Sequence, residues 1–372
     1  MFIYIILGIV LLLFWLFNLP FLTVKRREIV YIKCINWLFI FCVFIFLFFL
    51  SYMRGINVGT DYYLYFNFFN KLMYKEYFDL GIRSIYDIAN YFNDFRIITL
   101  IATLVFLLVF YYLQNKYSYS VVNFIYMFVI SFLFFFFLNG LRQAIAIAIL
   151  WIGLLSLSEN KNTKRELFLF FLIVVIAAQF HISAVMGFFF LVVKKFKING
   201  RTLFIGLLVV TFSFFTDILK DFIGSLLMNI EFYTEKYSYD TDFFFRVNKE
   251  KGIIQFIPIL MQFGFFFVWL KWKKSKGIKG NYIIENYYYL YLLFYAASGI
   301  EAIDRFQLYL YPSIVFFYDM VLFLIIKSCN TKKELLVAWG SSTIIIFFWL
   351  AYYLLRIFQN TNGIVPYSFW FM

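Results

Sequence analysis

The chain has 372 residues, of which 64% are hydrophobic, 26% aromatic and only 14% charged. Soluble domains average about 25% charged residues, and a chain of this length cannot enclose so much apolar surface in a water-soluble fold. The composition therefore excludes a soluble cytosolic enzyme and predicts a membrane protein. A formal charge of +13 is better explained by lysines and arginines at the cytoplasmic ends of membrane spans, so we expect no nucleic-acid partner.

Apolar segments recur along the whole chain and predict an all-α polytopic membrane protein with about 12 transmembrane helices. The candidate helices cover about residues 2–20, 30–52, 97–114, 119–138, 143–158, 167–180, 182–193, 202–219, 253–270, 287–297, 306–326 and 335–354. Two outer loops, residues 53–96 and 217–252, exceed the usual connection length and are expected to be functional or partly helical. We expect residues 1–372 to form one integral membrane domain.

The charges between the apolar segments predict which loops face the cytoplasm. If the N-terminus lies outside and a turn at His181 separates two spans, the inner segments hold most of the 33 basic residues and few of the 20 acidic ones. One continuous helix over residues 167–193 would remove most of this asymmetry, because every later loop would change sides. The positive-inside rule therefore favours two spans and places His181 outside, together with both long loops.

Arginines in the outer segments indicate recognition of an anion. The outer segments are richer in arginine than the inner ones, in which lysine dominates, and the planar guanidinium group is well suited to phosphate. Arg142 stands at the outer start of a predicted helix, where free N–H groups and the helix dipole also favour an anion. It forms a polar cluster with Gln143 and the turn Asn139-Gly140. The alternative is an interfacial arginine that extends toward water.

Two further residues have side chains suited to acid–base chemistry. His181 is the only histidine, and an ordinary imidazole pKa of about 6.5 allows general-base catalysis, although a structural polar role is the alternative. In the first long loop, Arg54 and Asp61 stand among glycines and predict a folded polar turn. Tyr62 and Tyr65 offer ring faces and hydroxyls, for sugars or for an interfacial aromatic belt.

Several short motifs follow one another along the chain in a recognisable order. They are Gly59-Thr60-Asp61-Tyr62 with Tyr65, Leu138 to Ala146, Phe180-His181-Ile182-Ser183-Ala184, Asp304-Arg305 with Tyr309, and Val365-Pro366-Tyr367. The second is similar to the Arg-Gln-x-x-Ala signature of EpsG-type polysaccharide polymerases, and the third resembles their Phe-His-x-Ser-Ala signature. Together the motifs span almost the whole chain and resemble the EpsG family.

The resemblance implies the role of a Wzy-type polymerase, a glycosyltransferase of the bacterial inner membrane. Such a protein joins oligosaccharide repeat units on undecaprenyl diphosphate outside the cytoplasm, for O-antigen (lipopolysaccharide), capsule or exopolysaccharide. The family also implies a GT-C-like helical bundle and a chain-length regulator protein as a partner. The sugars, the linkage, the retaining or inverting outcome, the kind of polysaccharide and the oligomeric state stay open.

The implied reaction assigns a role to each candidate residue. Arg142 and Arg305 are expected to bind the diphosphate, and His181 to act as the base or to orient the acceptor hydroxyl, with Asp61 as the alternative base. The other expected substrate-binding residues are Arg54, Gln143, Asp304, Tyr62, Tyr65 and Tyr367. Because arginines can replace a metal ion and the single histidine stands apart from the three cysteines, we expect no metal and no cofactor.

Three other functions compete with the polymerase. A GT-C glycosyltransferase that uses a polyprenyl-phosphate sugar is the nearest, because it shares the outer site and the use of arginine. A lipid-linked oligosaccharide flippase predicts charges buried along a central path, yet only Asp319 clearly falls inside a predicted span. A membrane acyltransferase would place its histidine at the cytoplasmic face, whereas the charges place His181 outside.

Overall fold

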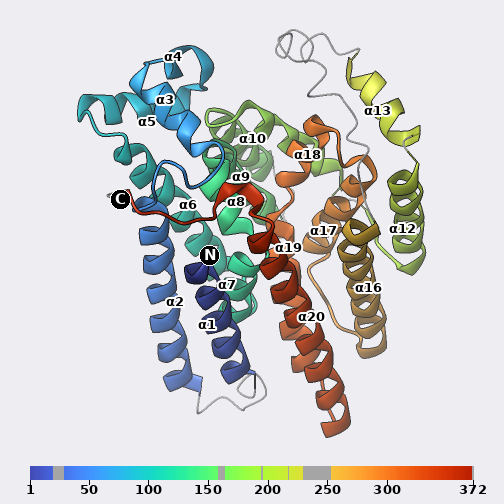
Figure 1. Ribbon diagram of the computed structural model, residues 1–372. Helices are drawn as coiled ribbons and strands as arrows, with labels where there is room; N and C mark the ends of the chain where they lie inside the picture. Colours follow the sequence, from blue (N-terminus) through green and yellow to red (C-terminus); the bar gives the residue numbers. More distant parts are fainter. Residues whose placement is uncertain (20–28, 158–163, 194–195, 217, 229–252, 371–372) are drawn as a thin grey trace. The chain divides into compact units, whose positions relative to one another are not determined.

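Figure 1 shows the computed structural model, whose description covers residues 1–19, 29–157, 164–193, 196–216, 218–228 and 253–370. Within these ranges the regular structure is helical, and the only strand-like pairing is an isolated bridge between Arg54 and Phe369. The predicted all-α class is confirmed. The contacts divide the chain into two compact units, unit 1 (Met1–Phe188 and Tyr318–Met372) and unit 2 (Phe189–Phe317). A single membrane domain stays a prediction.

The helices of unit 1 are α1 (Phe2–Asn18), α2 (Ile29–Tyr52), α3 (Tyr62–Asn70), α4 (Tyr74–Tyr77), α5 (Leu80–Tyr91), α6 (Arg96–Tyr117), α7 (Val121–Ile130), α8 (Leu133–Asn139), α9 (Leu141–Ser156), α10 (Lys164–Ala178), α20 (Lys332–Phe358) and the 3₁₀ turns η3 (Ile182–Met186) and η5 (Thr361–Gly363). Those of unit 2 are α12 (Gly200–Phe215), α13 (Ile218–Met228), α16 (Ile253–Lys276), α17 (Tyr282–Phe294), α18 (Glu301–Leu308) and the 3₁₀ turn η4 (Tyr295–Ala297). The boundaries between the units fall within α11 (Gly187–Val193) and α19 (Pro312–Lys327).

Among the described residues, four helices are long and apolar enough to cross a membrane: α2, α6, α16 and α20. The bent pair α7–α8 makes a fifth if it is counted as one span. The helices α1, α9 and α12 and the segment η3–α11 are apolar but shorter. The structure thus supports four to five candidate membrane spans. Each predicted apolar segment overlaps one or more helices within the described ranges, but the prediction of about 12 spans is not confirmed.

Two of the predicted spans are interrupted in the structure. The axes of α7 and α8 are bent by 44° where Phe132 adopts a left-handed backbone with φ of 78°. The segment predicted over residues 306–326 is also broken, because α18 ends at Leu308 and α19 begins at Pro312. Proline fits this first helical position, since the N–H that it lacks has no helical partner there.

The chain reverses direction at His181, as the charge pattern predicts. A Cβ atom on Gly187 would lie 3.1 Å from Val174, and the ring centres of Phe171 and Phe188 are 5.9 Å apart. Residues before and after the turn therefore pack against each other, which excludes one continuous helix. The two separate segments are confirmed, whereas the membrane face of the turn stays a prediction.

Asp319 is buried and connects α19 to the start of α7. Its carboxylate accepts the backbone N–H groups of Tyr119 at 2.7 Å and Ser120 at 2.8 Å. A helix N-terminus leaves such N–H groups without partners inside the helix, and it also favours a negative charge. These bonds favour a structural role for Asp319 over a proton relay.

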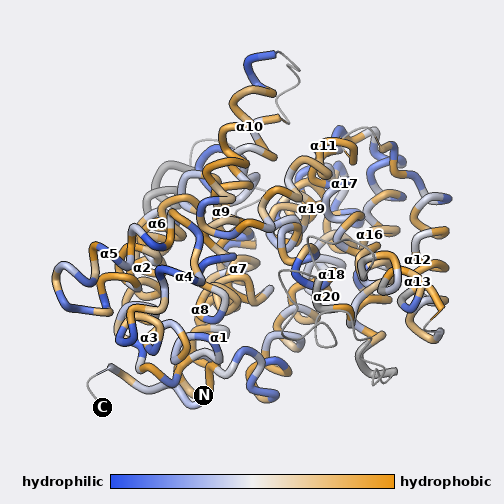
Figure 2. Tube along the Cα trace, turned by 90° about the horizontal axis from the view of Figure 1, so that it is seen from above, coloured by the Kyte–Doolittle hydropathy of each residue, from blue (hydrophilic) through white to orange (hydrophobic). Residues whose placement is uncertain are grey.

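The first long loop, which was expected to be functional or partly helical, is largely helical. Between α2 and α6 the chain forms α3, α4 and α5, which lie together at one end of unit 1 (Figure 1). Figure 2 shows hydrophilic stretches around α4 and α5, whereas α10 is hydrophobic along most of its length. Of the second long loop, residues 218–228 form α13, and residues 217 and 229–252 lie outside the described part of the chain.

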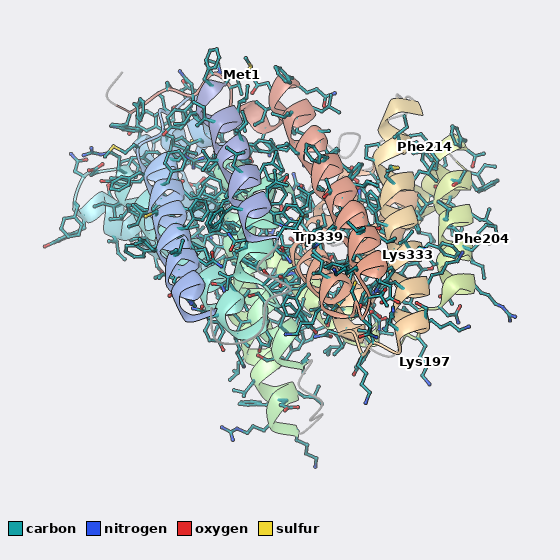
Figure 3. All side chains as sticks on the ribbon, turned by 90° about the horizontal axis from the view of Figure 1, so that it is seen from below. Met1, Lys197, Phe204, Phe214, Lys333 and Trp339 are labelled. Atoms are coloured by element: carbon teal, nitrogen blue, oxygen red, sulfur yellow. The ribbon has the colours of Figure 1, made fainter. Side chains whose placement is uncertain are left out.

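In unit 2, α12 presents large apolar side chains on its surface. Phe204 is 58% exposed, and Figure 3 shows it directed away from its helix. Phe212 and Phe215 are 55% and 58% exposed. An apolar surface of this kind suits contact with lipid, since a soluble protein rarely leaves so many aromatic rings in water.

The membrane face of the His181 turn can be tested with single cysteines in a variant without the native ones. Ile182 is 37% exposed beside the turn, and Lys197 is exposed on a segment predicted to be inside. We expect a membrane-impermeant maleimide to label Ile182→Cys on intact spheroplasts and Lys197→Cys only after permeabilisation. Labelling of Ile182→Cys that requires permeabilisation would contradict the predicted orientation.

Candidate functional site

The Arg54 loop (residues 53–61) docks on the end of α8. Arg54 is fully buried, and its Nη1 donates to the backbone carbonyl of Leu138. Its guanidinium carbon lies 3.8 Å from the centre of the Tyr62 ring. A helix C-terminus leaves carbonyl groups without partners and favours a positive charge. Arg54 therefore stabilises the end of α8.

Two other nitrogen atoms of Arg54 make no hydrogen bond within the described part of the chain. Its Nε and Nη2 atoms are enclosed and have no hydrogen-bond partner among the described residues. Burial lowers the pKa of Arg54, and the nearby Tyr62 opposes this shift. Enclosed donors without partners are costly, so their presence at Arg54 calls for a physical reason.

The same loop makes three further contacts with the end of α8. Gly59 has a φ of 100°, and a Cβ atom there would lie 2.7 Å from the carbonyl oxygen of Leu138. Asn139 Oδ1 accepts the hydroxyl of Thr60 at 2.6 Å and the backbone N–H of Asp61 at 2.9 Å. The glycine is needed both for its backbone conformation and for this close approach.

Asp61 stands directly before α3 but does not cap it with its side chain. Aspartate in this position usually accepts N–H groups of the first helical turn. Here Asn139, from another segment of the chain, accepts the Asp61 N–H instead. The half-buried carboxylate of Asp61 is therefore not committed to the end of the helix.

Arg142 is the second residue of α9 and is half-buried. Its guanidinium carbon lies 4.3 Å from the centre of the Phe78 ring and 6.0 Å from that of Tyr65. Its Nε is enclosed and has no hydrogen-bond partner within the part of the chain that is described. Burial raises the pKa of Tyr65, against the opposing charge of Arg142, so this phenol stays protonated at neutral pH.

The His181 turn is attached to the start of α5. The backbone N–H of Gly81 donates to the carbonyl of Gln179 at 2.8 Å. His181 is half-buried, and its Nδ1 lies 2.5 Å from Ser183 Oγ. Phe78, which contacts Arg142, precedes Gly81 by three residues.

Unit 1 thus brings three of the predicted residues into one region. Arg142 and Asp61 are linked through Asn139, which bonds Asp61 and lies three residues before Arg142. His181 is linked to the same region through α5 and Phe78. Gln143 follows Arg142 and is buried, with 8% exposure.

The C-terminal strap (residues 360–370) covers the Arg54 loop. The backbone N–H of Gly59 donates to Gly363 at 2.9 Å, and that of Gly55 donates to Ser368 at 2.8 Å. These bonds tie the end of the chain to a loop some 300 residues earlier. The Pro-Tyr motif in this segment can be recognised in the sequence, whereas its contact with the first loop cannot.

Two of the predicted tyrosines use their hydroxyls within the protein. Tyr367 donates to the carbonyl of Leu50 at 3.0 Å, and burial raises its pKa to about 12. The Tyr62 hydroxyl lies 2.5 Å from Thr99 Oγ1. These contacts fix the two rings beside the Arg54 loop, where Tyr62 has no exposed surface and lies beneath the Arg54 guanidinium group.

Asp304 and Arg305 belong to unit 2, in α18. The carboxylate of Asp304 accepts the backbone N–H of Gly299 at 3.0 and 3.2 Å, which holds the turn before the helix. Arg305 is half-buried.

No three His, Cys, Asp or Glu side chains in the described ranges lie close enough together to share a metal ion. A metal-independent reaction stays a prediction.

Comparison with known proteins agrees with the helical membrane architecture and with the motifs. The family model of the EpsG family matches residues 37–369, and the chain therefore belongs to the EpsG family, the Wzy-like polysaccharide polymerases. The resemblance inferred from the motifs is confirmed. Comparisons with curated proteins and with solved structures give no match. The family and the apolar helices indicate a glycosyltransferase-like polymerase of polysaccharide biosynthesis in a membrane.

The close approach of Gly59 to α8 predicts a large effect of a single methyl group. Gly59→Ala should destabilise unit 1 by about 1–3 kcal/mol from backbone strain alone, with the contact to Leu138 adding to it. Thermal unfolding of the purified protein in detergent measures the effect. Gly340→Ala is the matched control, because a Cβ atom at this position of α20 would meet nothing within 4 Å. This variant should stabilise the protein by about 0.5–1 kcal/mol. Equal melting temperatures for the two variants would contradict the predicted docking.

Proposed function

We propose that this protein polymerises undecaprenyl-diphosphate-linked oligosaccharide repeat units at the outer face of the bacterial inner membrane. The observation that carries the proposal is Arg142, a half-buried cation at the start of α9 with an enclosed, unpartnered Nε among the described residues. Its guanidinium group lies over Phe78, in the same region as Asp61 and His181. Membership of the EpsG family supports the reaction class.

The proposed reaction is a displacement at a sugar carbon. A hydroxyl oxygen of the incoming repeat unit attacks the anomeric carbon of the chain, and a new glycosidic bond forms. The bond from that carbon to the diphosphate oxygen breaks, and undecaprenyl diphosphate leaves with the electron pair. The proton of the attacking hydroxyl passes to a base on the protein.

Arg142 is assigned to the leaving diphosphate. Its planar group offers paired donors that match phosphate oxygens, and the start of α9 adds the positive end of a helix dipole. The aromatic rings of Phe78 and Tyr65 exclude water beside it, which strengthens the attraction to a developing negative charge. Arg305 is the second proposed diphosphate ligand.

His181 is the proposed base, and Asp61 is the alternative. In the tautomer in which His181 Nδ1–H donates to Ser183, the Nε2 lone pair is the site that accepts the proton. Asp61 suits the same role because its carboxylate does not cap α3. The pH dependence of turnover distinguishes His181 from Asp61, because a histidine ordinarily loses its proton at a higher pH than an aspartate does.

The remaining candidates are proposed to hold the sugar and the diphosphate in place. Arg54 is fully buried and would act indirectly, by holding the end of α8. The half-buried ring of Tyr367 would pack on a sugar face, while the buried Tyr62 and Tyr65 would hold Arg54 and Arg142 in place. The proposed set is Arg54, Gln143, Asp304, Tyr62, Tyr65 and Tyr367. A chain-length regulator protein is the proposed partner, with the active site facing the periplasm or the outside of the cell.

Removal of the Arg142 guanidinium should abolish polymer growth. Arg142→Ala is expected to lower the polymerisation rate by about 100- to 1,000-fold, since it removes a donor to the leaving group. Arg142→Lys keeps the charge but not the paired donors, so its loss should be intermediate. The measurement is the gel ladder of surface polysaccharide from a deletion strain complemented with each variant.

Arg201→Ala serves as the control, because Arg201 is exposed at the start of α12, and it should give the wild-type ladder. A full ladder in the deletion strain would exclude the polymerase and favour a single-sugar transferase. Loss of even the single repeat unit would indicate an earlier step, such as flipping. A full ladder with Arg142→Ala would remove the central residue of the proposal.

Removal of the His181 imidazole should change the pH profile as well as the rate. If His181 is the base, wild-type turnover should rise as increasing pH removes the imidazole proton, because only the neutral imidazole accepts a proton. His181→Ala should lose this rise, with a rate about 100- to 10,000-fold lower, whereas Asp61→Asn should keep the rise. An unchanged polymer length and yield in His181→Ala would refute the base assignment and leave Asp61.

A further inference from the structure

The contacts of Asn139 suggest a role beyond shaping a turn. We infer that Asn139 is a positioning residue that holds Asp61 in register with Arg142. This inference rests on the proposed polymerase function with Asp61, the alternative base, in the catalytic role. The observation behind it is a single side-chain oxygen that receives two donors from the Arg54 loop, the Thr60 hydroxyl at 2.6 Å and the Asp61 N–H at 2.9 Å.

The chemistry of the two donors fixes the orientation of the Asn139 amide. A backbone N–H can only donate, so the atom of Asn139 that faces Asp61 must be the oxygen and not the NH₂ group. A carbonyl oxygen has two lone pairs, and both are used here.

Asn139 also belongs to the segment that places Arg142. It is the last residue of α8, and Gly140 is the residue before α9. Arg142 follows in the first turn of α9, so a shift of this short segment would also move Arg142. One segment thus carries the proposed diphosphate ligand at one end and the anchor of the proposed alternative base at the other.

The neighbouring contacts allow little freedom at this anchor. Arg54 donates to the carbonyl of Leu138, and Gly59 packs against that same carbonyl. The start of α3 receives no cap from the Asp61 side chain. Loss of the Asn139 oxygen would therefore leave the Asp61 N–H without its acceptor and release the loop beside Arg142.

Displacement of a reacting group by about 1 Å can lower turnover by about 100-fold. A positioning role therefore predicts a fall in kcat of up to about 100-fold for Asn139→Ala, with KM for the lipid-linked repeat unit unchanged. Asn139→Asp keeps an acceptor oxygen and should recover part of kcat. Thr60→Val removes one of the two bonds at an exposed residue, whereas Thr60→Ser keeps the hydroxyl and should match the wild type.

The test combines hydrogen exchange with kinetics on the full-length purified chain in detergent. We expect faster amide exchange at Asp61 in Asn139→Ala, and restored protection in Asn139→Asp. Because both changes act on one contact, Thr60→Val should lower kcat in the wild-type background but have no further effect in Asn139→Ala.

Suppose that the wild-type enzyme polymerises the repeat unit. If Asn139→Ala then shows the same amide exchange or the same kcat as the wild type, the inference is overturned. The inference would also be overturned if Asn139→Ala lowers kcat only in proportion to a lower melting temperature and Asn139→Asp does not restore kcat. If Asn139→Ala does not fold, Thr60→Val against Thr60→Ser decides, since equal kcat values for these two would refute the inference. A wild-type protein that forms no polymer from the lipid-linked repeat unit would instead refute the proposed function, and this inference with it.

Discussion

The candidate site depends on the contacts that the Arg54 loop makes with the end of α8. One stretch of two residues receives the buried Arg54, the close approach of Gly59 and two hydrogen bonds from Thr60 and Asp61. The end of a helix is suited to this role, because its last carbonyl groups have no partners within the helix. The Arg54 loop, which follows the candidate membrane span α2, is thereby fixed onto the junction between α8 and α9.

The same arrangement explains how cations are tolerated among aromatic rings. Arg54 and Arg142 lie over Tyr62 and Phe78 respectively, and a cation over a ring face gains electrostatic energy that water would otherwise supply. Neither arginine makes an ion pair with a carboxylate in the described ranges. Positive charge held in this way attracts an anionic ligand more strongly than charge already neutralised by the protein.

Several features could be predicted from the sequence because they depend on local composition or on summed charge. The reversal at His181 follows from the distribution of lysines and arginines, and the structure confirms the turn. The ordered motifs predicted the family, which the match over residues 37–369 confirms. The contact of Asn139 with Asp61 was missed, although asparagine directly before glycine at a helix end is a usable signal for a polar turn.

By itself the sequence determined the helical membrane class, the approximate positions of the apolar segments, the family and the candidate residues, since apolar runs, charge asymmetry and short motifs are local properties. Only the tertiary structure decided which of those residues meet. Asp61 and Asn139 are 78 residues apart, and the C-terminal strap lies on a loop near the start of the chain. Such pairings depend on how helices pack and which backbone groups remain unsatisfied at their ends, and neither property can be read from a local pattern.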